Sequence, residues 1–140
     1  MPEIKKILFL CTKNSVRSQM AEGLMKALGH HRFKAQSAGT APTQVHPLAI
    51  QVMKEIGIDI SHHTSKSLNL FLNEEFDYII TLCDRAAMSC PTFPGQGKRL
   101  HWSIEDPGTA MGTIEEKLVV FRRIRDEIKT KIEELLKLTS

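Results

Sequence analysis

An apolar run that ends in a cysteine, followed by a short loop and a helical pattern, constrains this chain more than any other feature. Residues 7–10 are all apolar, Cys11 follows them, and five residues separate Cys11 from Arg17. Beyond the loop, apolar residues recur with the spacing of one helix face, at Met20, Leu24 and Leu28. The sequence therefore predicts a buried strand, a loop and a helix in direct succession.

Such a loop predicts a nucleophilic cysteine at the bottom of an anion-binding site. A loop that opens a helix turns several backbone N–H groups toward one point and adds the positive end of the helix dipole. The same field favours the thiolate of Cys11, and Arg17 adds a planar charged group that can hold two oxygens of one anion. We expect an oxyanion to be bound by Thr12, Lys13, Asn14, Ser15, Val16 and Arg17.

Taken alone, the spacing of Cys11 and Arg17 is weak evidence for an anion-binding site. Charged residues are so common that an arginine often follows a cysteine at this distance by chance. The strand before the loop, the helix after it and the small hydroxyls within it strengthen the interpretation; these are Thr12, Ser15 and Ser18. The alternative is an inert, buried Cys11 that packs like a small apolar residue at the end of a strand. We also expect Ser18 to hydrogen-bond Cys11 and keep it ionised.

Size and composition limit the class of protein. A chain of 140 residues suits one domain, residues 1–140. The net charge of +3 helps to attract anions, but no cluster of basic and aromatic residues suggests nucleic-acid binding. No segment has the length of a membrane span or the pattern of a signal peptide. Three cysteines, an odd number, favour a reducing compartment, so we expect a cytoplasmic protein.

The rest of the chain alternates between predicted strands and helices. Strands are expected at residues 5–10, 33–38, 76–82 and 99–102. The first helix should end near Gly29, which suits a left-handed cap, and a second should run from Pro47 to Gly57. The last helix should begin with a capping box of Thr113 and Glu116, followed by an apolar stripe of Ile114, Leu118, Phe121, Ile124, Ile128, Ile132 and Leu135.

This alternation predicts a doubly wound α/β sandwich built on a parallel sheet with helices on both faces. Ligands of such sheets bind beyond the carboxyl ends of the strands. Cys11, Cys83 and Asp106 each lie at or shortly after the end of a predicted strand. Asp106 could act there as a general acid; the alternative is a turn-initiating Asp-Pro pair.

Residues 11–23 resemble the phosphate-binding loop of low-molecular-weight protein tyrosine phosphatases. They are closer still to the loop of the thioredoxin-coupled arsenate reductases that share that fold. The resemblance covers nearly the whole chain, through His101-Trp102 and Asp106-Pro107 to Ile128. It implies a low-molecular-weight phosphatase-like fold with a central four-stranded parallel sheet, and a general acid at Asp106.

Cys83 and Cys90 distinguish the two subfamilies. A phosphatase needs one cysteine, whereas reduction of arsenate needs two electrons, which thiols can supply by forming a disulfide. Cys83 and Cys90-Pro91 resemble the redox pair of the reductases in spacing and flanking residues; the alternative is two buried cysteines that never meet. Phosphatases of this fold usually carry aromatic residues after the Asp-Pro, where this chain has Gly108 and Thr109.

The resemblance implies reduction of arsenate to arsenite by a cysteine relay. Cys11 would attack arsenic, Arg17 would hold the oxyanion, and Asp106 would protonate the departing oxygen. Cys83 would then attack Cys11, and Cys90 would attack Cys83 to leave a disulfide that thioredoxin reduces. Two alternatives stay open: a tyrosine phosphatase or other phosphomonoesterase, and a non-catalytic module that binds oxyanions or senses redox state.

The chain departs from the family pattern at three positions. Lys13 stands where many members have glycine, which is acceptable if its φ is negative, and Val16 replaces a frequent extra cysteine. Lys66 stands where several reductases have an aspartate that binds potassium together with residues matching Asn14, Glu22 and Ser37. A lysine ammonium there predicts that the potassium site is altered or lost.

No further metal or cofactor is expected. The six histidines include only two close pairs, His30-His31 and His62-His63, and adjacent residues rarely face one ligand. A zinc site built from Cys83, Cys90 and a histidine is an alternative, but closed zinc sites need four well-spaced ligands. We therefore expect solvated loop histidines and a monomer whose partners are arsenate and thioredoxin.

Overall fold

The strand that leads into Cys11 forms the centre of the sheet. In the computed structural model, which describes residues 3–83 and 93–139, β1 (Lys5–Cys11) lies between β2 (Phe33–Gly39) and β3 (Tyr78–Thr81). β4 (Lys98–His101) completes the order β2-β1-β3-β4, and all three pairings are parallel. The predicted α/β fold with a four-stranded parallel sheet is confirmed.

The apolar run of β1 is buried because both faces of the sheet are covered. Ile7 and Phe9 belong to the main core on one face, whereas Leu8 and Leu10 belong to a smaller core on the other. A strand covered on both faces reads as a continuous apolar run rather than an alternating one. This burial fixes the position of Cys11 at the carboxyl end of the sheet.

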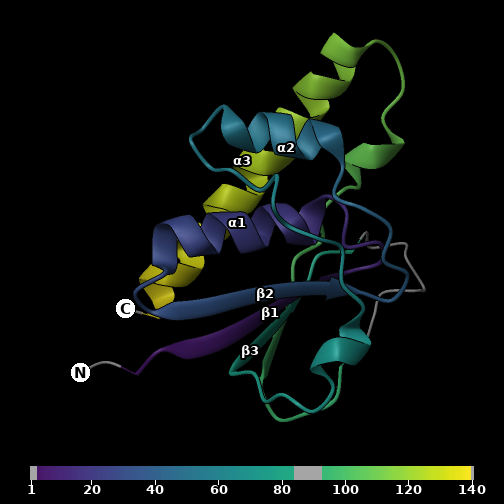
Figure 1. The fold of residues 1–140 in the computed structure, drawn as a ribbon. Coiled ribbons are helices and arrows are strands. Elements are labelled where there is room, and N and C mark those ends of the chain that lie inside the picture. Colours follow the sequence, from purple (N-terminus) through teal and green to yellow (C-terminus); the bar gives the residue numbers. More distant parts are fainter. Residues whose placement is uncertain (1–2, 84–92, 140) are drawn as a thin grey trace.

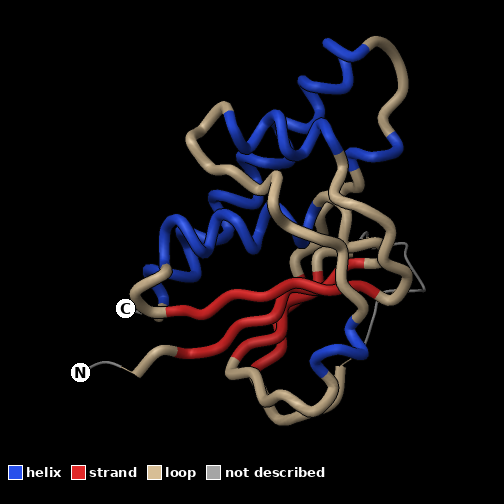
Figure 2. The backbone as a smooth tube through the Cα atoms, viewed as in Figure 1, coloured by secondary structure: helices blue, strands red, loops and turns tan. Residues whose placement is uncertain are grey.

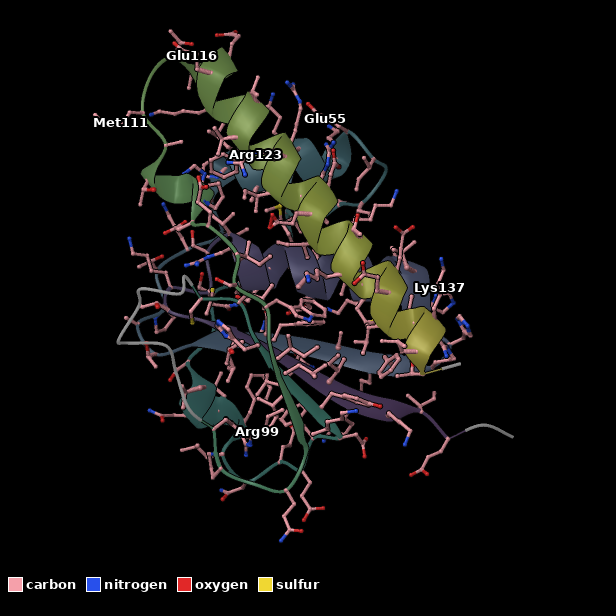
Figure 3. All side chains as sticks on the ribbon, turned by 180° about the vertical axis from the view of Figure 1, so that it is seen from behind. Glu55, Arg99, Met111, Glu116, Arg123 and Lys137 are labelled. Atoms are coloured by element: carbon pink, nitrogen blue, oxygen red, sulfur yellow. The ribbon has the colours of Figure 1, made fainter. Side chains whose placement is uncertain are left out.

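Three α-helices gather over the face that carries the main core (Figures 1 and 2). α1 (Arg17–Gly29) packs against β1 and β2, α3 (Ile114–Leu138) packs on α1, and α2 (Pro47–Lys54) packs on α3. Figure 3 shows α3 running across this side of the molecule from Glu116 to Lys137, with Glu55 beside it. Glu55, just after α2, accepts hydrogen bonds from Arg122 and Arg125 of α3.

On the other face of the sheet, which carries Leu8 and Leu10, the described cover is a short 3-10 helix and a cluster of phenylalanine rings. The 3-10 helix η1 (Leu68–Phe71) lies there. Edge-on ring contacts link Phe71, Phe76 and Phe93, with centroids 5.9 Å apart in each pair. None of the described helices has an apolar stretch that could cross a bilayer.

The prediction of a left-handed cap at Gly29 is wrong. Gly29 is the last residue of α1, and the following cap residue, His30, has a right-handed φ of −58°. A Cβ at Gly29 would lie 2.7 Å from the Sδ of Met25 and 2.9 Å from the Cδ2 of Leu136. The space beside Gly29 is therefore limited by the ends of two side chains, Met25 on α1 and Leu136 on α3, rather than by its backbone conformation.

Two other expectations are corrected at the ends of elements. Ile114 is 56% exposed, because it is the first residue of α3 and precedes the turns that pack on the core. The third strand is shorter than predicted: Phe76 lies in the core of the second face, before β3 begins at Tyr78. The capping box of Thr113 and Glu116 and the helix start at Pro47 are confirmed.

Candidate active site

A pocket of about 330 Å³ opens at the carboxyl edge of the sheet, where β1 meets α1. It brings together Cys11, Arg17 and Asp106 from three separate parts of the chain. The complete lining is Cys11, Thr12, Lys13, Ser15, Val16, Arg17, His46, Asp106, Gly108 and Thr109. Five of the six residues expected to hold an oxyanion thus line the pocket, and the sixth, Asn14, lies buried beneath the loop.

The loop between β1 and α1 turns its backbone carbonyls away from the pocket. Four consecutive carbonyl oxygens accept hydrogen bonds from neighbouring segments. These bonds are Ala41 N to Thr12 O (2.9 Å), Thr43 N to Lys13 O (3.2 Å), Ser65 Oγ to Asn14 O (2.7 Å) and His46 N to Ser15 O (3.0 Å). In a trans peptide the next N–H points opposite to the carbonyl, so the N–H groups of residues 13–16 are directed inward. Inward N–H groups at a helix start form an anion-binding concavity.

Asn14 holds this loop in shape. It is the described non-glycine residue with a positive φ, at 50°, a conformation that asparagine tolerates better than most residues. Its Oδ1 accepts hydrogen bonds from the Lys66 N–H and from Gln19 Nε2, both at 2.8 Å. These two donors fix the orientation of the side-chain amide. Lys13 is not among the positive-φ residues, so the condition for replacing a glycine there is met.

The fixed amide of Asn14 determines what Ser18 can do. The Asn14 Nδ2 group donates one hydrogen to Ser37 Oγ at 2.9 Å and one to Ser18 Oγ at 2.7 Å. Ser18 therefore accepts from Asn14, and its own hydroxyl hydrogen is left for Cys11 Sγ, 2.9 Å away. The network therefore makes Ser18 the donor and Cys11 Sγ the acceptor of this bond.

A buried carboxylate anchors the far end of the network. Glu22 is 2% exposed and receives hydrogen bonds from Ser37 and Lys26, both at 2.5 Å, with the Lys66 ammonium at 3.3 Å. Burial alone works to raise the pKa of Glu22. The hydrogen bonds from Lys26 and Ser37 and the charge of Lys66 outweigh it and hold this pKa below its usual value.

These residues do not fit a potassium ion. The Lys66 ammonium lies within 3.3 Å of Glu22 Oε1 and 3.4 Å of the Thr64 carbonyl oxygen, where it provides the positive charge itself. The Asn14 Oδ1 already accepts two hydrogen bonds, and two lone pairs are its full capacity. Among residues 3–83 and 93–139, no group of three or more histidine, cysteine or acidic side chains could hold a metal ion.

Arg17 and Asp106 face each other across the pocket. The Arg17 Nη1 donates to the carbonyl oxygen of Ile104 at 2.9 Å, which sets the plane of the guanidinium and leaves other N–H groups for an oxyanion. Asp106 Oδ1 accepts from the Gly108 N–H at 2.9 Å, and Oδ2 lies 3.8 Å from Arg17 Nη2. Since Oδ1 accepts the Gly108 N–H, Oδ2 is the oxygen of Asp106 that faces Arg17.

His46 belongs to the site, although the sequence predicted a solvated loop histidine at this position. Its side chain lines the pocket, and its Nδ1 accepts the Leu48 N–H at 3.1 Å to cap α2. The sequence held one signal: His46 directly precedes Pro47, and proline at the first helical position marks the preceding residue as the cap. The role of Gln19 was also missed, because its contacts with Asn14 and Thr64 join distant segments.

Cys83 lies outside the pocket lining but close to it. β1 and β3 pair with Leu10 opposite Thr81, and the Leu82 N–H donates to Leu10 O at 2.9 Å. Cys83 therefore follows the strand next to the one that ends in Cys11. Cys83 is 1% exposed and disulfide-bonded, whereas Cys11 is a free thiol. Cys90, the other expected relay residue, lies outside the described residues.

Comparisons with known proteins agree over almost the entire chain. A sequence profile described as Low molecular weight phosphotyrosine protein phosphatase matches residues 6–139. The arsenate reductase of Halalkalibacterium halodurans is 49% identical, over 91% of this chain and 92% of that protein. A solved structure of an arsenate reductase in its oxidised state has a TM-score of 0.82 and 37% identity, covering 98% of this chain and 100% of that one. A thioredoxin-dependent arsenate reductase of Corynebacterium glutamicum has a TM-score of 0.72 and 29% identity, covering 97% and 61%.

Proposed function

Because the chain belongs to the low molecular weight phosphotyrosine protein phosphatase family, we propose that it uses the family pocket to reduce arsenate to arsenite. One observation carries this proposal. A free thiol, Cys11, lies at the base of an oxyanion pocket, and a disulfide-forming cysteine, Cys83, follows the adjacent strand. The similarity to arsenate reductases at up to 49% identity supports the same substrate.

The first step is attack of the Cys11 thiolate on arsenic. Arg17 and the inward N–H groups of the loop neutralise the charge of the arsenate oxygens. Asp106 gives its proton from Oδ2 to a hydroxyl oxygen of hydrogen arsenate, which leaves as water. The product is a Cys11–arsenic(V) adduct in which no electrons have yet been transferred.

The second step transfers two electrons. Once the disulfide that holds Cys83 in this structure has been reduced, the thiolate of Cys83 attacks the sulfur of Cys11, the sulfur–arsenic bond breaks, and its electron pair stays on arsenic, which leaves as arsenite. Cys90 then attacks Cys83, so that Cys11 departs as a thiolate and a Cys83–Cys90 disulfide remains. A dithiol such as thioredoxin reduces this disulfide; the similarity to a thioredoxin-dependent reductase supports that donor.

Strand geometry supports the encounter of Cys11 and Cys83. Adjacent strands lie about 4.8 Å apart and rise about 3.3 Å per residue. Because Leu10 pairs with Thr81, Cys83 lies one residue beyond the level of Cys11, which gives a separation of about 6 Å between their α-carbons. A disulfide requires α-carbons within about 7 Å. Side chains alternate between the two faces of a sheet, so an extended chain would direct Cys83 away from the face of Cys11. The relay therefore needs the backbone after β3, which ends at Thr81, to turn Cys83 toward Cys11.

Hydrolysis of a phosphate monoester is the second candidate, because the pocket accommodates phosphate as well as arsenate. The residues after Asp106-Pro107 argue against an aryl phosphate: Gly108 and Thr109 line the pocket, and neither offers a ring to hold a phosphotyrosine. A non-catalytic module that binds oxyanions or senses redox state would use the same pocket without turnover.

A paired assay tests the proposal. Arsenate-dependent oxidation of NADPH is measured with thioredoxin and thioredoxin reductase, and hydrolysis of p-nitrophenyl phosphate is measured beside it. We expect sustained arsenate turnover with at most slow ester hydrolysis. Ester hydrolysis alone would select the phosphatase, and inactivity in both assays would select the binding module. Gel filtration of the same sample tests the expectation of a monomer.

A further inference from the structure

His46 lies at the pocket although the relay does not use it. Its backbone N–H donates to Ser15 O at 3.0 Å, which ties it to the oxyanion loop. Its half-buried ring packs on Phe121 of α3, with centroids 4.9 Å apart, and lines the same pocket as Cys11 and Asp106. The side chain is therefore held in place by three different elements of the structure.

The helix cap fixes the tautomer of this histidine. Nδ1 accepts the Leu48 N–H at 3.1 Å, so it carries no hydrogen. A neutral imidazole that accepts at Nδ1 must carry its hydrogen on Nε2. The donor of the ring is thus Nε2–H, and it is free of the cap.

The charges around the ring come from four elements. Asp106 lies on the segment that begins η2 (Pro107–Thr109), Lys117 lies on α3, Arg17 on α1 and Lys13 on the loop. Burial has the largest effect on the pKa of His46 and lowers it. Asp106 raises this pKa in part and Lys117 lowers it further, so the pKa stays below its usual value. The ring is therefore neutral at neutral pH and becomes a cation as the pH falls.

We propose that His46 is a further oxyanion-binding residue, whose Nε2–H donates to an outer oxygen of the bound tetrahedral anion beside Asp106. The proposal deepens the proposed function but requires only that the pocket binds a tetrahedral oxyanion. Protonation adds a hydrogen at Nδ1, so the imidazolium gives up the Leu48 cap. A dianion in the pocket stabilises the imidazolium form, so binding strengthens as His46 takes up a proton. The residue thereby couples oxyanion affinity to pH in the range where histidine titrates.

Sulfate is the suitable probe, because it stays a dianion throughout the titration range of histidine. Its Kd is measured by calorimetry between about pH 5.5 and about pH 8, in a Cys11→Ser background that removes the ionisation of the thiol. His46→Asn is added to that background. Asparagine is a strong helix cap, so it keeps an acceptor for the Leu48 N–H while removing the Nε2–H donor. His62→Asn is the control, since His62 is exposed and is not part of the pocket lining.

We expect His46→Asn to weaken sulfate binding about tenfold at pH 8 and to abolish most of the tightening at lower pH. His62→Asn should change neither. Sulfate binding by His46→Asn with the background Kd at every pH would show that His46 only caps α2. Absence of sulfate binding in the Cys11→Ser background itself would instead refute the oxyanion pocket on which the proposed function rests.

A second measurement keeps His46 in place, so its result does not depend on whether the His46→Asn variant folds. The imidazole resonances of His46 are followed by NMR during a pH titration with and without sulfate. Reciprocity of binding requires sulfate to raise the pKa of His46, by about one pH unit for a tenfold preference for the cation. An unchanged titration of His46 at saturating sulfate would overturn the proposal.

Discussion

Ser18 has a single hydroxyl hydrogen, and its surroundings leave only one use for it. Asn14 donates to Ser18, and the orientation of Asn14 is fixed by Lys66 and Gln19. The bond to Cys11 therefore runs from oxygen to sulfur, although the hydrogen position follows from the network rather than from the distance. Cys11 is therefore hydrogen-bonded by a side chain whose role is determined by Gln19 on the same helix and by Asn14 and Lys66 on two other segments.

Replacing Cys11 by serine is expected to abolish arsenate reduction while leaving oxyanion binding intact. Serine keeps the shape of the loop but has no accessible anion at neutral pH. Arg17→Lys should lose both arsenate reduction and oxyanion binding, because a point charge cannot replace a planar group that holds two oxygens. Arsenate turnover and sulfate affinity are measured on both variants. Turnover above background by Cys11→Ser would remove Cys11 from its assigned role.

Glu22 makes the stability of the protein depend on pH in a defined direction. Its pKa is lower in the folded chain than in the unfolded chain, so the folded state favours the carboxylate. The resulting stability is present above the ordinary carboxyl pKa of about 4.3 and is lost as the pH falls through the folded value. Glu22→Gln should therefore cost about 1–3 kcal/mol near neutral pH, and this cost should shrink in acid.

Urea unfolding of wild type and Glu22→Gln at a series of pH values measures this difference. Glu133→Gln, at an exposed position on α3, is the matched control and should have almost no effect at any pH. A stability difference for Glu22→Gln that stays constant from neutral pH to acid would refute the assignment of the stabilising charge to Glu22.

Lys66 leads to a prediction about potassium. Its ammonium lies 3.3 Å from Glu22 Oε1 and supplies the charge that a bound cation would otherwise bring. We expect potassium and sodium at constant ionic strength to give the same rate and the same melting temperature. Lys66→Asp, which restores a carboxylate and keeps the backbone N–H to Asn14, is the variant in which a potassium effect should emerge. A severalfold, potassium-specific increase in the wild-type rate would contradict the prediction.

At the scale of the elements, the end of β2 and the oxyanion loop are packed backbone against backbone. A Cβ on Gly39 would lie 2.4 Å from Thr12 O and 2.7 Å from Cys11 O. Both atoms are main-chain oxygens that cannot rotate away. The Gly39 N–H also donates to Lys66 O at 2.9 Å, so β2 is held from the other side as well.

Gly39→Ala is therefore expected to displace the loop. The overpacking should destabilise the fold by about 1–3 kcal/mol and weaken sulfate binding, because the inward N–H groups move with the loop. Gly23→Ala is the matched control: its Cβ would approach Ile60 Cγ2 at 2.7 Å, a core side chain, so it should overpack the core without pressing on the backbone of the loop. Thermal unfolding and sulfate titration of both variants provide the comparison. Equal effects on sulfate affinity would show that backbone contact at Gly39 is unimportant.

At the scale of the whole molecule, the local features of the sequence were predictable and the long-range ones were not. The strand, loop and helix around Cys11 follow from a continuous apolar run and a helical spacing, both of which are local. Gly29 was misinterpreted because one of the side chains that limit the space beside it, Leu136, lies more than a hundred positions away. His46 was missed for the same reason, since Phe121 and Asp106 reach it only through the fold. The role of a residue whose partners are distant in the sequence cannot be predicted from the residues that flank it.

The proposed relay also belongs to the scale of the whole molecule, because it would move the oxidation from buried Cys11 to two cysteines later in the chain. Cys11 is 2% exposed at the base of the pocket, so a thiol on another protein cannot attack it directly. In the proposed relay, Cys83 takes over the oxidation from Cys11, and Cys90 then takes it over from Cys83. Cys83 follows the neighbouring strand, and Cys90 is the remaining cysteine of the chain.

Removing each of the later cysteines should stop the reaction at a different point. Cys90→Ser should release one arsenite per enzyme and stall as a Cys11–Cys83 disulfide, because nothing resolves that bond. Cys83→Ser should stall earlier, with arsenic still attached to Cys11 and no arsenite released. Mass spectrometry after a single exposure to arsenate distinguishes the two species, since the first loses two hydrogens and the second gains arsenic. Sustained turnover by Cys90→Ser would show that Cys83 passes its oxidation directly to the reductant and that Cys90 is not part of the relay.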